Sequence, residues 1–251
     1  MFRKRAELWD EFDHLYQTLF TNSSQYIKII EQLSKKRMGL TRSEISKKTN
    51  LPANGALSKM LHDLAGSGFI RKYAFYGRKS KDTLYQLSDY YSLFYYRFIK
   101  DRFGKDENFW SHTLDNPARR AWAGLTFEQL CKDHIPQIKE KLGIAGVLSE
   151  ESSWYGSIGG ETEDSSNGAQ IDLLIDRRDQ VINICEIKFS INEFQIDKEY
   201  DQKLRNKISV FRQATNCRKT IQLSMITTFG MQKNKYSSIV SNEVRLDDLF
   251  R

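Results

Sequence analysis

Hydrophobic residues in the first third of the chain recur with the period of an α-helix. In residues 23–37 the repeat has the i, i+3, i+4, i+7 spacing of a half-buried helix, and it consists of Tyr26, Ile29, Ile30 and Leu33. Thr41 stands three residues before Glu44, which is the pattern of a capping box and predicts a second helix ending near Thr49. A third helix is predicted over residues 53–65, where the apolar positions are Leu57, Met60, Leu61 and Leu64.

Two runs rich in β-forming residues follow, at 69–76 and 83–87, and they flank a basic turn. Three helices followed by a hairpin are typical of a winged helix–turn–helix, which we predict for residues 23–88 after an N-terminal helical segment at 1–22. Such folds lay the third helix in the major groove of DNA, although many serve as protein–protein modules. The residues predicted to bind DNA are Ser58, Lys59 and His62 on the third helix and Arg78, Lys79 and Lys81 in the turn.

Residues 89–115 are interpreted as an aromatic linker helix and a connection. The helix carries Tyr90, Tyr91, Phe94, Tyr95, Tyr96, Phe98 and Phe103. Aromatic side chains can stack on the bases of single-stranded nucleic acid. At helical spacing they more often pack in a core, so we expect a buried helix that docks one domain on the other.

The segment 116–251 predicts a second domain with mixed secondary structure. Asn116 and Pro117 are typical of a helix start, and this helix should run to about His134. Further on, the apolar runs 171–176 and 181–189 surround a short polar turn and predict a β-hairpin.

The register of this hairpin decides which polar side chains share a face. If a three-residue turn sets Arg177 opposite Val181, Asp172 lies opposite Glu186, and Lys188 points to the same side. A turn of even length would send Glu186 to the other face. Two neighbouring carboxylates repel each other unless a divalent cation lies between them, and Mg²⁺ or Mn²⁺ accepts such oxygen ligands. A lysine beside the cation could orient its water for attack on a phosphodiester.

These residues resemble the pattern of the PD-(D/E)XK nuclease superfamily, in which a helix with Glu precedes an Asp and then a Glu-x-Lys on paired strands. The resemblance implies that Asp172 and Glu186 are metal ligands, that Lys188 is the catalytic lysine, and that Glu128 is an auxiliary ligand or water holder. Residues 193–212 can supply the following helix, and 220–227 a further strand. On that helix Lys203, Arg205 and Lys207 could grip a phosphate backbone, but a solvated helix face is the favoured interpretation.

A second resemblance covers most of the chain. The winged helix, the aromatic helix, the nuclease-like motif and the ending from Val244 to Phe250 are similar to the C-terminal region of the archaeal-type AAA ATPase family. Members of that family carry a phosphate-binding loop ending in Gly-Lys-Ser or Gly-Lys-Thr, and this sequence has none. Either the chain is the C-terminal part of a longer protein or it lacks the ATPase half. Gln170 stands where the nuclease superfamily often has an acid, which removes one potential ligand.

Charge divides the chain in the same way as the patterns do. Of the net charge of +7, residues 23–87 contribute 13 basic and 4 acidic side chains, whereas residues 111–251 contain 19 basic and 20 acidic ones. This asymmetry favours a polyanion-binding module joined to a nearly neutral one. The three cysteines are too far apart for a CxxC pair, and residues 1–10 lack the apolar segment of a signal peptide. No run approaches the ~18 apolar residues of a membrane span, so we expect a cytoplasmic protein without membrane contact.

The sequence therefore predicts an α+β or α/β protein in which a winged helix precedes a restriction-endonuclease-like mixed sheet. The predicted function is Mg²⁺- or Mn²⁺-dependent cleavage of double-stranded DNA, with an AAA ATPase domain as an expected partner and self-association left open. Two alternatives remain: a nuclease-like scaffold without activity that regulates an ATPase, and a DNA-binding regulator whose second domain dimerises.

Overall fold

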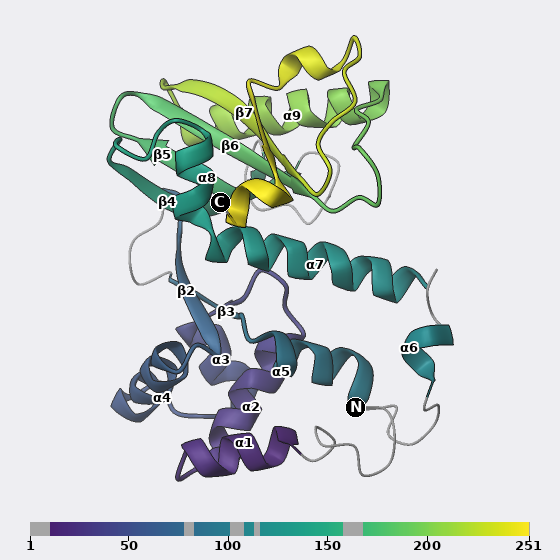
Figure 1. Cartoon of the computed structure of the whole chain (residues 1–251). Helices are drawn as coiled ribbons and strands as arrows, with labels where there is room; N and C mark the ends of the chain where they lie inside the picture. The colour runs from purple at the N-terminus through teal and green to yellow at the C-terminus, as the bar shows by residue number, and fades with distance from the viewer. Residues whose placement is uncertain (1–10, 78–82, 101–107, 113–115, 158–167, 251) are drawn as a thin grey trace. The chain divides into compact units, whose positions relative to one another are not determined.

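The computed structural model describes residues 11–77, 83–100, 108–112, 116–157 and 168–250 (Figure 1). These residues form nine α-helices and eight strands with parallel and antiparallel pairing, so the protein is a mixed α and β protein. None of the helices within these ranges has the length and apolar character needed to cross a bilayer. The chain divides into two compact units, Met1–Ala74 with Lys79–Arg119 and Phe75–Arg78 with Arg120–Arg251, called here the N-terminal and C-terminal units.

In the N-terminal unit, helices precede and surround a small antiparallel sheet. Its strands lie in the order β1-β3-β2, with Leu40 opposite Tyr85 and Ile70 opposite Leu87. The predicted hairpin of β2 and β3 is confirmed. The elements are α1 (Glu11–Leu19), α2 (Ser23–Ser34), β1 (Leu40–Thr41), α3 (Arg42–Thr49), α4 (Gly55–Gly66), β2 (Ile70–Phe75), β3 (Leu84–Leu87), α5 (Tyr90–Phe94), a π-helical turn (Tyr95–Ile99) and α6 (Phe109–His112).

Local side-chain caps determine where the helices of this unit begin. The predicted capping box is confirmed, because the Thr41 hydroxyl accepts the backbone N–H of Glu44 (3.3 Å) and the Glu44 carboxylate accepts that of Thr41 (2.7 Å). α4 begins at Gly55 because the side chain of Asn54 accepts the N–H groups of Ala56 and Leu57 (3.0 and 3.3 Å). Its predicted apolar positions are all buried: Leu57, Met60, Leu61 and Leu64.

The aromatic helix packs within the N-terminal unit. The ring of Tyr95 stacks on Phe12 of α1, with centroids 3.9 Å apart and planes 5° apart. A buried hydrogen bond of 2.8 Å joins Tyr16 of α1 to Ser92. These contacts favour the packing role over an exposed stacking platform.

The C-terminal unit contains a five-stranded run in the order β4-β5-β6-β7-β8. The pairs β4–β5 and β5–β6 are antiparallel, whereas β6–β7 and β7–β8 are parallel. The elements are α7 (Pro117–Asp133), α8 (Ile135–Lys141), β4 (Ser149–Ser157), β5 (Gly168–Arg177), β6 (Val181–Lys188), α9 (Lys198–Thr215), β7 (Thr220–Thr227), a 3₁₀ turn (Ser237–Ile239), β8 (Asn242–Arg245) and a second 3₁₀ turn (Leu246–Phe250).

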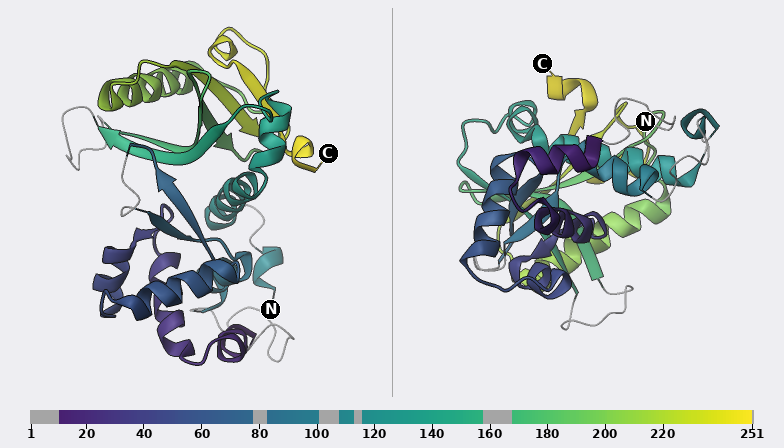
Figure 2. Two further views of the ribbon diagram at one scale, coloured as in Figure 1. Left: turned by 90° about the vertical axis from the view of Figure 1, so that its left-hand side faces the viewer. Right: turned by 90° about the horizontal axis from the view of Figure 1, so that it is seen from below.

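Helices cover both faces of this sheet, with α7 on one face and α9 on the other (Figures 1 and 2). As predicted, α7 begins at Asn116, whose side chain accepts the N–H of Ala118 (2.8 Å). On the α9 face, the rings of Trp154 and Phe211 meet edge to face at 5.2 Å. The core on the α7 face includes Phe127, Cys131, Ile138, Leu173, Ile175, Cys185, Ile187 and Ile226.

Candidate active site

The β5–β6 hairpin has the register on which the sequence prediction depends. Its turn is three residues long, Arg178 to Gln180, and the observed pairs include Leu174 opposite Ile184 and Asp176 opposite Ile182. Extending this register by two residues from Leu174 would set Asp172 across from Glu186. The turn of odd length is therefore confirmed, and Glu186 lies on the face that α9 covers.

Pairing between the two strands ends just before Asp172. The last pair is Leu173 with Cys185. On its other edge, β5 pairs with β4 through Leu174–Ser152 and Ile171–Trp154. Two residues of β5 lie between these pairs, but only one residue of β4, so β5 has a β-bulge at residues 172–173. The Ser153 hydroxyl donates to the Asp172 carbonyl at this bulge (2.6 Å). Bulges re-aim side chains and are common beside active sites, so Asp172 is not a regular ladder partner of Glu186.

Glu186 is buried, with 5% of its surface exposed, and it holds three donors. One carboxylate oxygen accepts the Tyr200 hydroxyl (2.6 Å) and lies 3.2 Å from the Lys188 ammonium; the other accepts Lys207 (2.5 Å). Burial alone would raise the pKa of Glu186, but the charges of Lys207 and Lys188, with hydrogen bonds from Lys207 and Tyr200, hold it below its ordinary value. Glu186 is therefore an ionised carboxylate in a cationic setting.

Tyr200 contacts two of the residues predicted from the hairpin, Glu186 and Lys188. Besides its bond to Glu186, its ring lies 5.5 Å from the Lys188 ammonium. Burial raises the pKa of the Tyr200 hydroxyl, and the negative charges of Glu186 and Asp172 raise it further. The hydroxyl is thus a protonated donor to Glu186. Asp172 itself is half-buried and accepts the side-chain amide of Gln170 (2.6 Å).

Two of these groups, Tyr200 and Lys207, were missed as site residues in the sequence. Both project from α9 on the stripe that also carries buried Leu204 and Phe211, at intervals of four, three and four residues. The prediction that Lys207 lies on a solvated face is wrong, since only 19% of its side chain is exposed. Lys203 is 65% exposed and Arg205 54%, as predicted. Polar residues that interrupt an apolar stripe were the available signal.

Glu128 is buried, although an exposed position is usual for a glutamate on a helix. It lies on α7, and its carboxylate binds the Lys132 ammonium at 2.9 Å. α7 packs against Cys185 and Ile187, which alternate with Glu186 and so occupy the opposite face of β6. Among the described residues, no three His, Cys, Asp or Glu side chains form a group that could hold a metal ion. Glu128 is therefore not gathered with Asp172 and Glu186 into such a group, and its auxiliary role stays a prediction.

The predicted DNA-binding residues fall partly within the described ranges. Ser58, Lys59 and His62 are exposed on α4, and Lys59 forms an ion pair with Asp63 at 2.8 Å. The guanidinium of Arg42 on α3 donates to the carbonyls of Ala53 and Asn54 (2.8 and 2.9 Å), which fixes the turn before α4. The turn residues Arg78, Lys79 and Lys81 lie outside the described residues.

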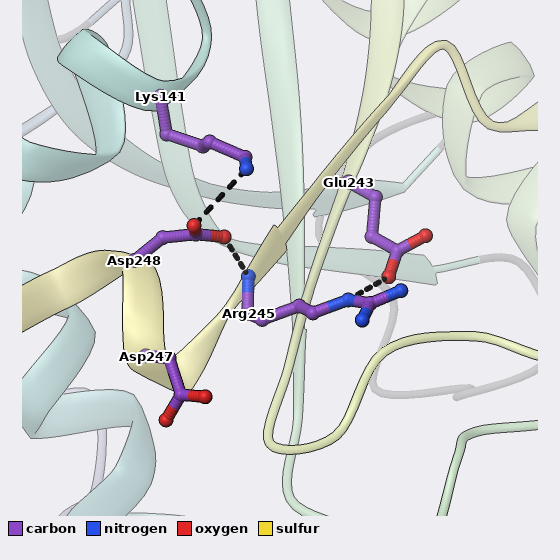
Figure 3. Close-up of a pocket in the computed structure, with 5 residues that line it drawn as sticks. All are labelled: Lys141, Glu243, Arg245, Asp247 and Asp248. Atoms are coloured by element: carbon purple, nitrogen blue, oxygen red, sulfur yellow. Dashed lines mark hydrogen bonds and ion pairs between the residues drawn. The ribbon is translucent and has the colours of Figure 1, made fainter.

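A separate polar cavity of about 320 Å³ lies near the C-terminal end of the chain (Figure 3). The Asp248 carboxylate accepts the Lys141 ammonium (3.0 Å) and the backbone N–H of Arg245 (2.9 Å), and Glu243 accepts the Arg245 side chain (2.9 Å). The two bonds of Asp248 tie the last 3₁₀ turn to α8 and β8, and Asp247 adds a third carboxylate to a lining with two cations. Asp248 and Lys141, two of the charged side chains around the cavity, therefore have a structural role, which is to hold the last 3₁₀ turn in place.

The chemistry available around Tyr200 is that of two carboxylates and two ammonium groups in a partly buried place. Carboxylate oxygens are the ligands that Mg²⁺ and Mn²⁺ prefer, so the donor set of Asp172 and Glu186 fits such a cation, with water or substrate as the remaining ligands. Comparisons with protein-family models, curated proteins and solved structures give no match to this chain. The functional assignment rests on the residues themselves.

Proposed function

We propose that the chain is a divalent-metal-dependent DNA endonuclease in which a winged helix delivers duplex DNA to a PD-(D/E)XK domain. The order α2-β1-α3-α4-β2-β3, with strands side by side as β1-β3-β2, supports the winged helix. The order α7-α8-β4-β5-β6-α9-β7, with a parallel crossover through α9, supports the nuclease-like domain. An AAA ATPase domain remains the partner proposed from the family resemblance.

The observation that carries this proposal is the pairing of Glu186 with Lys188 beside Tyr200, with Asp172 within electrostatic range of the Tyr200 hydroxyl. Glu186 and Lys188 share a face of β6 by strand alternation, and the hairpin register, extended past Leu173, sets position 172 across from position 186, which is the arrangement that the motif needs. A bound Mg²⁺ or Mn²⁺ would lower the pKa of a water ligand and so supply the nucleophile.

The chain's own residues supply the remaining functions. Asp172 and Glu186 would hold the cation, and Tyr200 fixes one oxygen of Glu186 by its hydrogen bond. The Lys188 side chain is 38% exposed, so its ammonium can reach a phosphate at the surface while it stays beside Glu186. An ammonium placed there stabilises the negative charge that grows on the phosphate during attack.

Nicking of supercoiled plasmid in Mg²⁺ or Mn²⁺ tests the proposal. We expect Asp172→Asn and Glu186→Gln to lower the rate at least about a hundredfold, the order of effect seen when an electrostatic catalytic group is lost. Asp176→Asn is the matched control, since Asp176 lies four residues further along β5 and pairs with Lys219 (2.6 Å). Equal nicking by all four proteins would assign the activity to a contaminant and reject the proposal.

A scaffold without catalytic activity is the second candidate, because both oxygens of Glu186 already have partners. In that case the cluster is an ion-pair network that stabilises the packing of α9 on β6. Calorimetry separates the two candidates: the nuclease binds Mn²⁺, and Glu186→Gln abolishes the binding, whereas the scaffold gives no heat with either metal.

A further inference from the structure

Lys207 contacts a different oxygen of Glu186 from the one that Tyr200 and Lys188 contact. Its ammonium lies 2.5 Å from Oε2 of Glu186, while the hydrogen bond of Tyr200 and the ammonium of Lys188 both meet Oε1. Lys207 is also less exposed than Lys188, at 19% against 38% of the side chain. It is therefore the main counter-ion of the second oxygen.

The charges of the cluster are already balanced without a metal. Asp172 and Glu186 contribute two negative charges, and Lys188 and Lys207 contribute two positive ones. A divalent cation added to this balanced group would leave two uncompensated positive charges in a partly buried place, which is unfavourable at low dielectric. Release of one ammonium reduces that excess, and Lys207 is the candidate because it is the partner of Oε2, whereas Oε1 keeps the hydrogen bond of Tyr200.

We infer that Lys207 is a resident counter-ion of Glu186 that a divalent cation displaces. This inference rests on the proposed function and adds to it a positioning residue from α9. Lys207 holds the Glu186 carboxylate in place while no metal is bound, and it competes with the metal for Oε2. In the metal-bound protein its ammonium is free to turn toward the surface.

The test measures Mn²⁺ binding by calorimetry and thermal unfolding in EDTA and in Mn²⁺, for the whole chain and its Lys207→Met variant. Lys207→Met removes the ammonium that competes with Mn²⁺ for Glu186, together with its charge-assisted hydrogen bond. We therefore expect Lys207→Met to bind Mn²⁺ at least about tenfold more tightly than the wild type. In EDTA this variant should unfold at a lower temperature than the wild type, and Mn²⁺ should raise that temperature more than in the wild type. Lys203→Met is the matched control, because Lys203 lies on α9 but pairs with exposed Glu199.

Two further variants at position 207 keep the test informative if Lys207→Met does not fold. Lys207→Gln removes the charge but can still donate to Glu186, so it should also bind Mn²⁺ more tightly; Lys207→Arg keeps the charge and should bind as the wild type does. Equal or weaker Mn²⁺ affinity in Lys207→Met and Lys207→Gln, with binding by the wild type, overturns the counter-ion role alone. No Mn²⁺ binding by any variant overturns this role and the metal-dependent nuclease together.

Discussion

The reactivity of the three cysteine thiols depends on how far each one is buried. Cys131 and Cys185 are buried, whereas Cys217 is half-exposed. Burial raises the pKa of Cys185 to about 12 and also raises the pKa of Cys131. Because the thiolate is the reactive form, both buried thiols should be inert at pH 8.

We therefore expect a disulfide reagent at pH 8 to react rapidly with one thiol per folded chain and with three in denaturant. Cys217→Ser should remove the rapid reaction and leave the other two thiols masked. Rapid reaction of two or three thiols in the folded wild type would show that the core around Cys185 opens readily.

The sequence predicted the site residues of the hairpin but not those of α9. The hairpin residues were predicted because strand alternation and turn length are local quantities. Lys207 and Tyr200 lie 21 and 14 positions from Glu186, and only the docking of α9 on the sheet brings them together. The bulge at Asp172 depends on the pairing of β5 with β4, which alternation within β5 cannot reveal. Long-range packing, rather than residue type, supplied the missing part of the site.

Where a side chain caps a helix, the local sequence determines where that helix begins. The capping box at Thr41 is such a signal, and it starts the helix that supports α4 through Arg42. Thr41→Ala should lower the free energy of unfolding by about 1 kcal/mol, the usual cost of losing an N-cap. Denaturant unfolding measures this, with Thr41→Ser as the control that keeps the capping oxygen. An equal loss in both variants would assign the effect to β1 instead of the cap.

The turn between β5 and β6 offers a second prediction at this scale. Gln180 has φ +67°, in the left-handed region where a side chain costs about 1–2 kcal/mol and glycine does not. Gln180→Gly should therefore raise the unfolding free energy by roughly 0.5–1 kcal/mol after the entropy cost of glycine. Arg178→Gly, in the same turn without a positive φ, should lower it by a similar amount. A loss in both variants would show that glycine entropy dominates the turn.

Elements without such signals were harder to predict. β1 has only two residues, too few to show alternation, and it forms because Leu40 and Thr41 pair with β3. The π-helical turn after α5 lies within the aromatic run, and its first residue, Tyr95, stacks on Phe12 of α1. Elements with a long apolar stripe, such as α2 and α4, lay within three residues of their predicted limits.

At the scale of the whole chain, basic residues are concentrated in the segment that holds α4, and the candidate active site lies in the nearly neutral segment. Affinity for a polyanion depends on phosphate contacts and falls with salt, whereas metal-dependent hydrolysis depends on a few buried carboxylates. The two proposed activities should therefore be separable by single substitutions.

Lys59→Ala should weaken binding to duplex DNA and reduce the slope of log affinity against log salt by about one, while Mn²⁺ binding stays unchanged. Glu186→Gln should do the reverse: DNA binding in EDTA as in the wild type, without cleavage in Mn²⁺. Lys35→Ala is the matched control for Lys59, because Lys35 is also an exposed lysine in an i, i+4 ion pair, with Glu31 at 3.2 Å. If Lys35→Ala reduces the salt slope as much as Lys59→Ala, α4 has no special role and the basic segment acts only through its net charge. Fluorescence anisotropy over a series of salt concentrations measures this difference.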